Sequence, residues 1–485
     1  MYGRKKKNTM ENQRVLLENG FHNFMALNSY IKEGIHKAEA EVDIFIERLP
    51  DSLGYAVFAG LRDVCEYLEN LAFTSADIEL FEGARELDSE LFDYLKSFRF
   101  SGILKSVPEG SAVFAGEPII TLRAPLGEIA LLESAILRIV RTQTLSATRL
   151  ARLACAAHGL PVIDMGEGML GADAALYAAR GARIGGACAT THTLAGKKLG
   201  IPLVSVMPHS FVQSVGDEYT AFVKWLESSH SPAVLTLDTY DTLASGVENA
   251  VRAILAVRES RSLDVSVRIE SGELIYLSKR VRERLCRAGL ADSKIMATGE
   301  LDEYKIRTLL KEGAPIDCFG VSKQAHLGFD VTCRLAALEE NGVMTPKIKL
   351  GESFSKISLP GSKKLLRFFD KRTGKAIADE ICLANEPVPN SRHTVFDPEA
   401  PWKAKELVNF EVREMLETVM EGGERKKILP PLDEIRERLA LERATLSSSV
   451  ERLDVGERYF VDLSEKLWTL RRRMTGAKRS AFFMR

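Results

Sequence analysis

Short apolar runs alternate with helical stretches through the middle of the chain, and this rhythm is the strongest structural signal in the sequence. Each run is followed by enough residues for a helix, and parallel strands need connections of that length. The pattern therefore predicts six parallel strands joined by helices. The six runs are Pro161–Asp164, Ile201–Met207, Ala233–Asp238, Val265–Ile269, Lys294–Ala297 and Ile316–Gly320.

Two architectures fit six such units: a closed barrel and an open, doubly wound sheet. Polar residues follow the end of every run, whereas an open sheet gathers its ligand residues at one switch point. The distribution of polar residues favours the barrel. We expect an α/β fold built around an irregular parallel α/β barrel.

The flanking parts have different patterns. A strand-like run at Glu41–Arg48 lies between two helical patterns, and the Gly/Pro-rich stretch Pro108–Pro118 indicates short antiparallel strands. The stretch Glu128–His158 is rich in Ala, Leu, Arg and Glu and contains neither Pro nor Gly, and its apolar positions recur at helical spacing. These patterns predict an N-terminal α+β domain, followed by a long and largely buried helix.

After the predicted barrel, residues 347–369 have a strand-rich pattern, and the chain beyond Pro401 is charged and is predicted to be helical, above all at 433–473. We therefore expect three domains. They are an N-terminal α+β domain at 1–125, the α/β barrel domain carrying the site at 126–345, and a strand-rich return with a helical C-terminal extension at 346–485.

Composition narrows the function classes. The 485 residues are 45% apolar and 27% charged, which is typical of a globular protein. The 66 basic and 67 acidic side chains leave a formal charge of -1, so no overall field attracts nucleic acid or an anionic membrane. The N-terminus lacks an apolar signal segment, and no run of about 18 apolar residues occurs, so we expect a cytoplasmic protein. The seven cysteines are scattered without a CxxC pair, as in reduced, structural thiols.

Polar residues cluster at the carboxyl end of every predicted strand, where the loops of a barrel form one site. Glycine-containing turns expose backbone N–H groups that suit a phosphate, and neighbouring carboxylates and hydroxyls suit ribose and Mg²⁺-bound pyrophosphate. The pattern therefore indicates a sugar phosphate ligand. The clusters are Asp164–Glu167, Met207–Ser210, Asp238–Asp241, Arg268–Glu273, Ala297–Glu300 and Gly320–Lys323.

Two of these residues suggest chemistry. His209 follows a buried strand, and Asp238 and Asp241 at the next strand end are candidate carboxylates to orient its imidazole. Arg268 lies within an apolar strand, where a guanidinium needs an anionic partner, either a carboxylate such as Glu270 or a ligand.

At these residues the sequence resembles the nicotinate phosphoribosyltransferase family, in order from about Leu16 to Phe369. The resemblance implies a type II phosphoribosyltransferase-like barrel. The most specific segments are Leu237-Asp-Thr-Tyr-Asp-Thr-Leu243, Val267-Arg-Ile-Glu-Ser-Gly-Glu-Leu274, Thr298-Gly-Glu-Leu-Asp-Glu-Tyr304, Phe319-Gly-Val321 and Leu359-Pro-Gly-Ser-Lys363.

The resemblance also implies an activity. Nicotinate and 5-phosphoribosyl 1-pyrophosphate would give nicotinate mononucleotide and pyrophosphate, a step of NAD salvage, with ATP as co-substrate and Mg²⁺ as cofactor. Such an enzyme is a glycosyltransferase that also acts as an ATP-dependent ligase. The resemblance further implies a homodimer with shared active sites, which places His22 across the interface.

Residue roles follow from the same resemblance. His209 is the residue that becomes transiently phosphorylated, Asp238 supports it, and Glu270 completes the catalytic set. Gly320, Val321, Ser322 and Lys323 bind the 5′-phosphate, and the ribose is held by Glu270 and Glu300. The other expected substrate-binding residues are His22, Met165, Thr190, Thr191, Arg268, Ser271 and Gly299. No protein ligand of the metal is assigned.

The chain departs from the family pattern mainly where the base is bound. His22 stands in place of a stacking Tyr, and Met165-Gly-Glu-Gly168 replaces a Phe-Gly-x-Arg sequence. Glu270, Glu273 and Glu300 replace aspartates. Two alternatives therefore remain beside nicotinate transfer: a phosphoribosyltransferase acting on a different base, and a non-catalytic relative that binds a nucleotide. A metal-dependent barrel hydrolase is less consistent, because no second His stands at a strand end to complete a ligand set.

Overall fold

The computed structural model describes residues 19–79, 81, 86–166, 171–229, 232–322, 327–352, 356–455 and 459–483. It divides the chain into two compact units. The first, called unit 1 below, consists of Met1–Thr144 and Leu327–Arg485, and the second, unit 2, consists of Leu145–His326. The division falls inside the long helix α6 (Leu126–Ala156), which confirms the helix predicted at Glu128–His158.

Unit 2 is built on a parallel sheet with the strand order β7-β6-β11-β10-β9-β8. Single parallel bridges join Thr190 to Leu203 and Val206 to Val234, so residues 203–206 lie between the two edge strands and close the sheet into a barrel. The predicted barrel is confirmed. Its strands are β6 (Val162–Asp164), β7 (Ala189–Thr190), β8 (Ala233–Thr236), β9 (Val265–Ile269), β10 (Lys294–Ala297) and β11 (Cys318–Val321).

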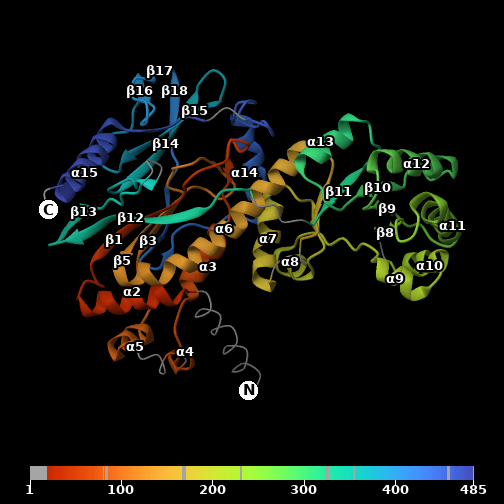
Figure 1. Cartoon of the computed structure of the whole chain (residues 1–485), viewed down its shortest axis with the longest axis horizontal. Coiled ribbons are helices and arrows are strands. Elements are labelled where there is room, and N and C mark those ends of the chain that lie inside the picture. Colours follow the sequence, from red (N-terminus) through yellow and green to blue (C-terminus); the bar gives the residue numbers. More distant parts are fainter. Residues whose placement is uncertain are drawn as a thin grey trace. The chain divides into compact units, whose positions relative to one another are not determined.

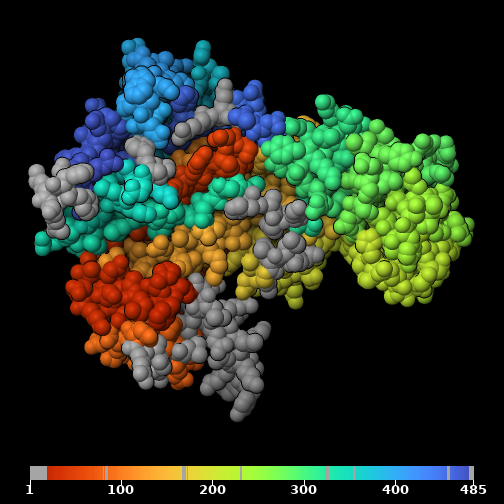
Figure 2. All heavy atoms as spheres, viewed as in Figure 1, coloured from red at the N-terminus to blue at the C-terminus, as the bar shows by residue number. Residues whose placement is uncertain are grey.

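Helices connect these strands, as the alternating pattern predicts (Figure 1). Helices α10 and α11 form a rounded end of unit 2 in the space-filling view (Figure 2). The helices are α7 (Ala172–Gly185), α8 (Thr193–Leu199), α9 (His209–Val215), α10 (Glu218–Ser228), α11 (Val247–Arg258), α12 (Leu274–Arg287) and α13 (Glu303–Lys311), and a π-helix, η2, spans Thr242–Gly246.

Two details of the barrel differ from the expectation. The run Ile201–Met207 makes only isolated bridges, because Pro202 has no N–H to donate to a ladder. Strand β7 was not predicted, since two residues within an Ala- and Gly-rich segment carry no periodic signal.

Unit 1 contains a seven-stranded sheet in the order β13-β12-β1-β5-β3-β19-β20. Strand β12 pairs with β1 and β19 pairs with β3, so segments far apart in the sequence share one sheet. Its strands are β1 (Glu39–Ile46), β3 (Ile103–Ser106), β5 (Ile120–Pro125), β12 (Val331–Glu340), β13 (Val343–Pro346), β19 (Glu417–Glu421) and β20 (Glu424–Arg425).

A four-stranded sheet and two two-stranded sheets complete the strands of unit 1. The four-stranded sheet has the order β18-β14-β15-β21, with β14 (Lys363–Asp370), β15 (Ala376–Leu383), β18 (Phe410–Glu414) and β21 (Val461–Leu463). The pairs are β2 (Ala56–Val57) with β4 (Ala112–Val113), and β16 (His393–Phe396) with β17 (Ala404–Leu407). The helices are α2 (Phe21–Lys32), α3 (Leu61–Asn70), α4 (Ser75–Glu79), α5 (Ser89–Lys96), α14 (Leu432–Thr445) and α15 (Glu465–Phe483).

Helices α14 and α15 confirm the helical character of the C-terminal extension. The prediction of helix throughout the residues after Pro401 was wrong, because residues 404–425 carry strands β17 to β20. In β18, buried Phe410 and half-buried Val412 alternate with exposed Glu411 and Arg413. Such a charged strand with one covered face reads as a polar helix when only composition is considered.

None of the helices in the described part of the chain combines the length and apolar character that a membrane span requires.

Candidate active site

The inner face of the barrel is identified by an apolar cluster to which five strands contribute: Ile163, Ala189, Val234, Met296 and Cys318. Side chains two residues further along a strand lie on the same face. Met165, Asp238, Thr298 and Gly320 therefore continue this inner face at the carboxyl ends of their strands. Arg268 pairs in register with Met296 and with Thr236, so it faces inward too, and so does Glu270.

His209 is the first residue of α9, following Pro208, and its ring lies among three side chains from neighbouring strand ends. Nδ1 is 3.2 Å from Oγ1 of Thr239, and Nε2 is 3.1 Å from Nη2 of Arg268. Nε2 is also 3.6 Å from Oε2 of Glu270. The structure thus brings together His209, Arg268 and Glu270, which lie far apart in the sequence.

Arg268 is the buried centre of this group. It is 7% exposed, and it forms an ion pair with Glu270. Burial lowers the pKa of the Arg268 guanidinium, and the nearby Asp238 carboxylate opposes that effect. Its Nε is buried and has no hydrogen-bond partner among the residues that the structure describes. The guanidinium therefore holds one buried N–H donor that no described residue satisfies.

Asp238 organises the loop after β9 and does not contact His209 in the described structure. Its Oδ2 accepts hydrogen bonds from the backbone N–H groups of Glu270 (3.0 Å) and Ser271 (2.9 Å) and from the Ser271 hydroxyl (2.7 Å). Its Oδ1 is buried without a hydrogen-bond partner in the described part of the chain. One oxygen thus fixes the backbone, and the other is buried and accepts no hydrogen bond from the described residues.

Small residues keep the neighbouring strand ends close to one another. A Cβ atom on Gly320 would lie 2.5 Å from Sδ of Met165 and 2.8 Å from Cγ2 of Thr298. Gly299 has a φ of +96°, and a Cβ there would lie 2.7 Å from the carbonyl oxygen of Glu270. Side chains at these two positions would disturb the inner face.

The residues expected to bind phosphate follow β11. Gly320 and Val321 end that strand, and the Val321 carbonyl accepts a hydrogen bond of 2.9 Å from the N–H of Met165. Ser322 is half-buried directly after the strand, and Glu300 is exposed after β10. Lys323 lies outside the described residues, as do Glu167 and Gly168.

Thr190 and Thr191 occupy different environments. Thr190 is buried and its hydroxyl donates to Oδ2 of Asp164 at 3.2 Å, on the face of the sheet opposite Ile163. Thr191 is half-buried, and its N–H donates to the Asp164 carbonyl. The Thr190 side chain thus links β6 to β7. Thr191 lies two residues after Ala189, which belongs to the inner-face cluster, so Thr191 is on the inner face.

His22 belongs to unit 1, where it is exposed in the first turn of α2. The neighbouring Phe21 is 48% exposed. The first turn of α2 therefore presents two rings to the surroundings of unit 1.

Sequence reasoning missed Thr239 and Thr298. Thr239 contacts the imidazole of His209, and Thr298 has a buried hydroxyl with no hydrogen-bond partner among the described residues. Both positions were visible as hydroxyl residues at strand ends, next to Asp238 and Gly299. Thr298 lies two residues beyond the inward-facing Met296, and this spacing was the available signal for its direction. Alternation gives no such signal for Thr239, which follows Asp238 directly.

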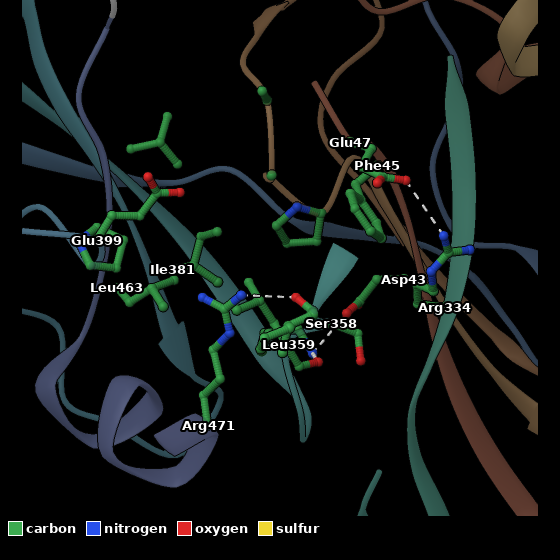
Figure 3. Close-up of a pocket in the computed structure, with 17 residues that line it drawn as sticks. Asp43, Phe45, Glu47, Arg334, Ser358, Leu359, Ile381, Glu399, Leu463 and Arg471 are labelled. Atoms are coloured by element: carbon green, nitrogen blue, oxygen red, sulfur yellow. Dashed lines mark hydrogen bonds and ion pairs between the residues drawn. The ribbon is translucent and has the colours of Figure 1, made fainter. Parts of the chain in front are cut away.

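A separate cavity of about 150 Å³ lies within unit 1 (Figure 3). Four charged residues that line the cavity form ion pairs with one another: Lys363 with Asp43 at 2.7 Å, and Arg334 with Glu47 at 3.5 Å. None of the barrel residues described above lines it. We therefore assign the candidate active site to the carboxyl ends of the barrel strands.

The described residues contain no group of three or more His, Cys, Asp or Glu side chains with the geometry of a metal site. A protein cage for a cation is therefore absent from that part of the chain. Mg²⁺ in phosphate-transfer sites is commonly held by one or two carboxylates together with substrate phosphates. The partnerless Oδ1 of Asp238 fits that role.

Comparisons with known proteins give one consistent result. The sequence models of the nicotinate phosphoribosyltransferase N-terminal domain and C-terminal domain match residues 17–141 and 362–471. The nicotinate phosphoribosyltransferase of Bacillus subtilis is 35% identical over 448 residues, covering 91% of each chain. Its counterpart from Caenorhabditis elegans is 29% identical and covers 92% of this chain and 91% of its own. The crystal structure of human nicotinic acid phosphoribosyltransferase matches with a TM-score of 0.82 and 25% identity, over 94% of this chain and 99% of that chain.

Proposed function

The chain belongs to the nicotinate phosphoribosyltransferase family, and we propose that it transfers a phosphoribosyl group from 5-phosphoribosyl 1-pyrophosphate to nicotinate in the cytoplasm. The products are nicotinate mononucleotide and pyrophosphate, so the enzyme serves NAD salvage. The observation that carries this proposal is the inner-face cluster of His209, Arg268 and Glu270 at the carboxyl ends of the barrel strands.

The proposed roles follow from the geometry of that cluster. Ribosyl transfer passes through an oxocarbenium-like state, in which positioning and charge stabilisation supply most of the catalysis. Glu270 and Glu300 would hold the ribose hydroxyls. The N–H groups of the turn after β11, from Gly320 to Ser322, would hold the 5′-phosphate, together with Lys323. Arg268, with a buried unpartnered Nε, would bind an anionic group of the substrate.

Mg²⁺ and ATP are part of the same proposal. Mg²⁺ would enter with the pyrophosphate of the donor and neutralise its charge, with Oδ1 of Asp238 as a protein ligand. His209 would accept the γ-phosphoryl group of ATP on Nε2. The phosphorylated histidine would then raise the yield of nicotinate mononucleotide by coupling ATP hydrolysis to the transfer.

We propose that the protein is a homodimer with shared active sites. The support is the first turn of α2, which exposes the rings of Phe21 (48% exposed) and His22. Exposed aromatic rings are typical of interaction sites. In a second copy of the chain, these rings would supply a stacking face for the pyridine base.

A different acceptor base is the second candidate. Met165, instead of an aromatic ring, lies on the inner face beside Gly320, so a flexible thioether replaces a rigid stacking surface. A pocket with this side chain admits other small aromatic acids.

The test measures pyrophosphate release with nicotinate, the phosphoribosyl donor, ATP and Mg²⁺. In His209→Ala we expect kcat/KM to fall at least about a hundredfold, or about 2.7 kcal/mol in barrier height. His158→Asn is the matched control, because His158 is an exposed histidine of the same unit whose φ of 48° asparagine tolerates. The control should retain the activity of the parent.

The acceptor is identified by a panel of pyridine and purine bases. Release with nicotinate above all others supports the proposal, and release with another base alone supports the second candidate. If no base promotes release by the parent protein, the proposed activity is refuted, and binding of nicotinate mononucleotide in calorimetry would then identify a non-catalytic relative.

A further inference from the structure

The two ring nitrogens of His209 have neighbours of different chemical character. Nε2 is 3.1 Å from Nη2 of Arg268, and a guanidinium can only donate a hydrogen bond. Nε2 must therefore accept, and it carries no proton in this arrangement. Nδ1 then carries the proton of the ring and donates it to Oγ1 of Thr239, at 3.2 Å.

The opposite tautomer is inconsistent with the same contacts. A proton on Nε2 would face an N–H of Arg268 at 3.1 Å, so two donors would be opposed. Glu270 does not relieve this conflict, because its Oε2 is 3.6 Å from Nε2 and is paired with Arg268.

Thr239 is the residue that makes this tautomer possible. The carboxylate that would otherwise orient the ring is Asp238, but its Oδ2 holds the backbone of Glu270 and Ser271. The Thr239 hydroxyl is the hydrogen-bond partner of Nδ1. It is also well positioned, since Asp241, two residues further along the chain, anchors the π-helix η2 by accepting hydrogen bonds from the N–H groups of Leu243 and Ala244.

We propose that Thr239 is a positioning residue that fixes His209 in the Nδ1–H tautomer, so that the lone pair of Nε2 is the nucleophile for a phosphoryl group. The consequence for phosphorylation rests on the proposed function of His209. The tautomer itself does not, because it follows from Thr239 and Arg268 alone.

The decisive measurement is the ¹⁵N spectrum of the full chain labelled with ¹⁵N-histidine, recorded at pH 8.5 without substrate. The signals of His209 are assigned by their loss in His209→Gln. We expect a protonated, pyrrole-type Nδ1 and an unprotonated, pyridine-type Nε2. A protonated Nε2 in the parent chain overturns the proposal.

Three variants separate positioning from general damage to the fold. Thr239→Val replaces the hydroxyl by a methyl group of nearly equal size, and we expect it to mix the two tautomers. Thr239→Ser restores the hydroxyl and should restore the parent spectrum. Thr308→Val is the matched control, since Thr308 is an exposed threonine on α13 of the same unit. An unchanged His209 spectrum in Thr239→Val refutes the inference.

Kinetics add a readout that a structural role alone would not change. With ³²P-labelled ATP, Thr239→Val should label His209 about tenfold more slowly, as expected for one lost hydrogen bond of about 1.4 kcal/mol, while KM for nicotinate stays at the parent value. Equal slowing in Thr239→Ser contradicts a role of the hydroxyl. If the parent chain releases no pyrophosphate with any base, the proposed function fails, and the spectrum still decides the tautomer.

Discussion

Glu117 offers a test of how burial controls protonation in unit 1. It is 0% exposed, its Oε2 accepts the N–H of Phe114 at 2.9 Å, and its Oε1 has no hydrogen-bond partner among the described residues. The adjacent carboxylate of Asp379 is held by Arg367 and by the Tyr459 hydroxyl. Burial, reinforced by the charge of Asp379, raises the pKa of Glu117 well above its ordinary value. We expect Glu117 to keep its proton to a higher pH in the folded chain than in the unfolded chain.

Glu117→Gln keeps the shape of the side chain but cannot ionise. Because the pKa of Glu117 is higher in the folded than in the unfolded chain, the folded protein binds more protons above the unfolded pKa. The parent therefore loses stability as pH rises, with a slope of about 1.4 kcal/mol per pH unit while the buried carboxyl keeps its proton. The stability of Glu117→Gln relative to the parent should therefore rise with pH between pH 5.5 and 7.5.

The assay is urea unfolding of the parent and of Glu117→Gln at pH 5.5, 6.5 and 7.5. Glu424→Gln is the control, because the Glu424 side chain is 83% exposed, and its stability should follow that of the parent at every pH. A difference between Glu117→Gln and the parent that stays constant across this range would show that Glu117 is ionised. In that case the reasoning about its protonation is refuted.

Three further predictions concern single contacts. Lys363→Met leaves the carboxylate of Asp43 without its cation in a buried place, since the two side chains are 1% and 6% exposed. The free energy of unfolding should therefore fall by about 3–5 kcal/mol. Adding Asp43→Asn should recover part of this loss, and no recovery would contradict the pairing. Gly246→Ala places a Cβ 2.0 Å from the Leu237 carbonyl oxygen and should cost about 1–3 kcal/mol in thermal unfolding; Gly171→Ala, where nothing lies within 4 Å, should unfold like the parent. Asp238→Asn keeps one oxygen for the three donors but replaces the partnerless Oδ1 by an uncharged NH2 group, and kcat should fall at least about tenfold, about 1.4 kcal/mol, with little change in the melting temperature.

Much of the barrel is a local property of the sequence. The run Val265–Ile269 and the helix α12 after it can be predicted because apolar spacing distinguishes strand from helix within a few residues. The same holds for the long helix α6. The chemical types at the strand ends, such as His209 and Glu270, are visible as well, because the βα alternation shows where each strand ends.

The sequence did not determine which groups meet. His209 contacts Thr239 and Arg268, which lie 30 and 59 residues away in the sequence. That Thr239 rather than Asp238 contacts the imidazole depends on side-chain directions that only the closed barrel fixes. Closure itself depends on single bridges at Thr190 and Val206, too short to leave a periodic signal. The sharing of one sheet by β3 and β19 likewise required the tertiary structure. Periodicity reports the burial of each residue, whereas the pairing of distant segments is decided by the packing of the whole unit, and the candidate site is built from such pairings.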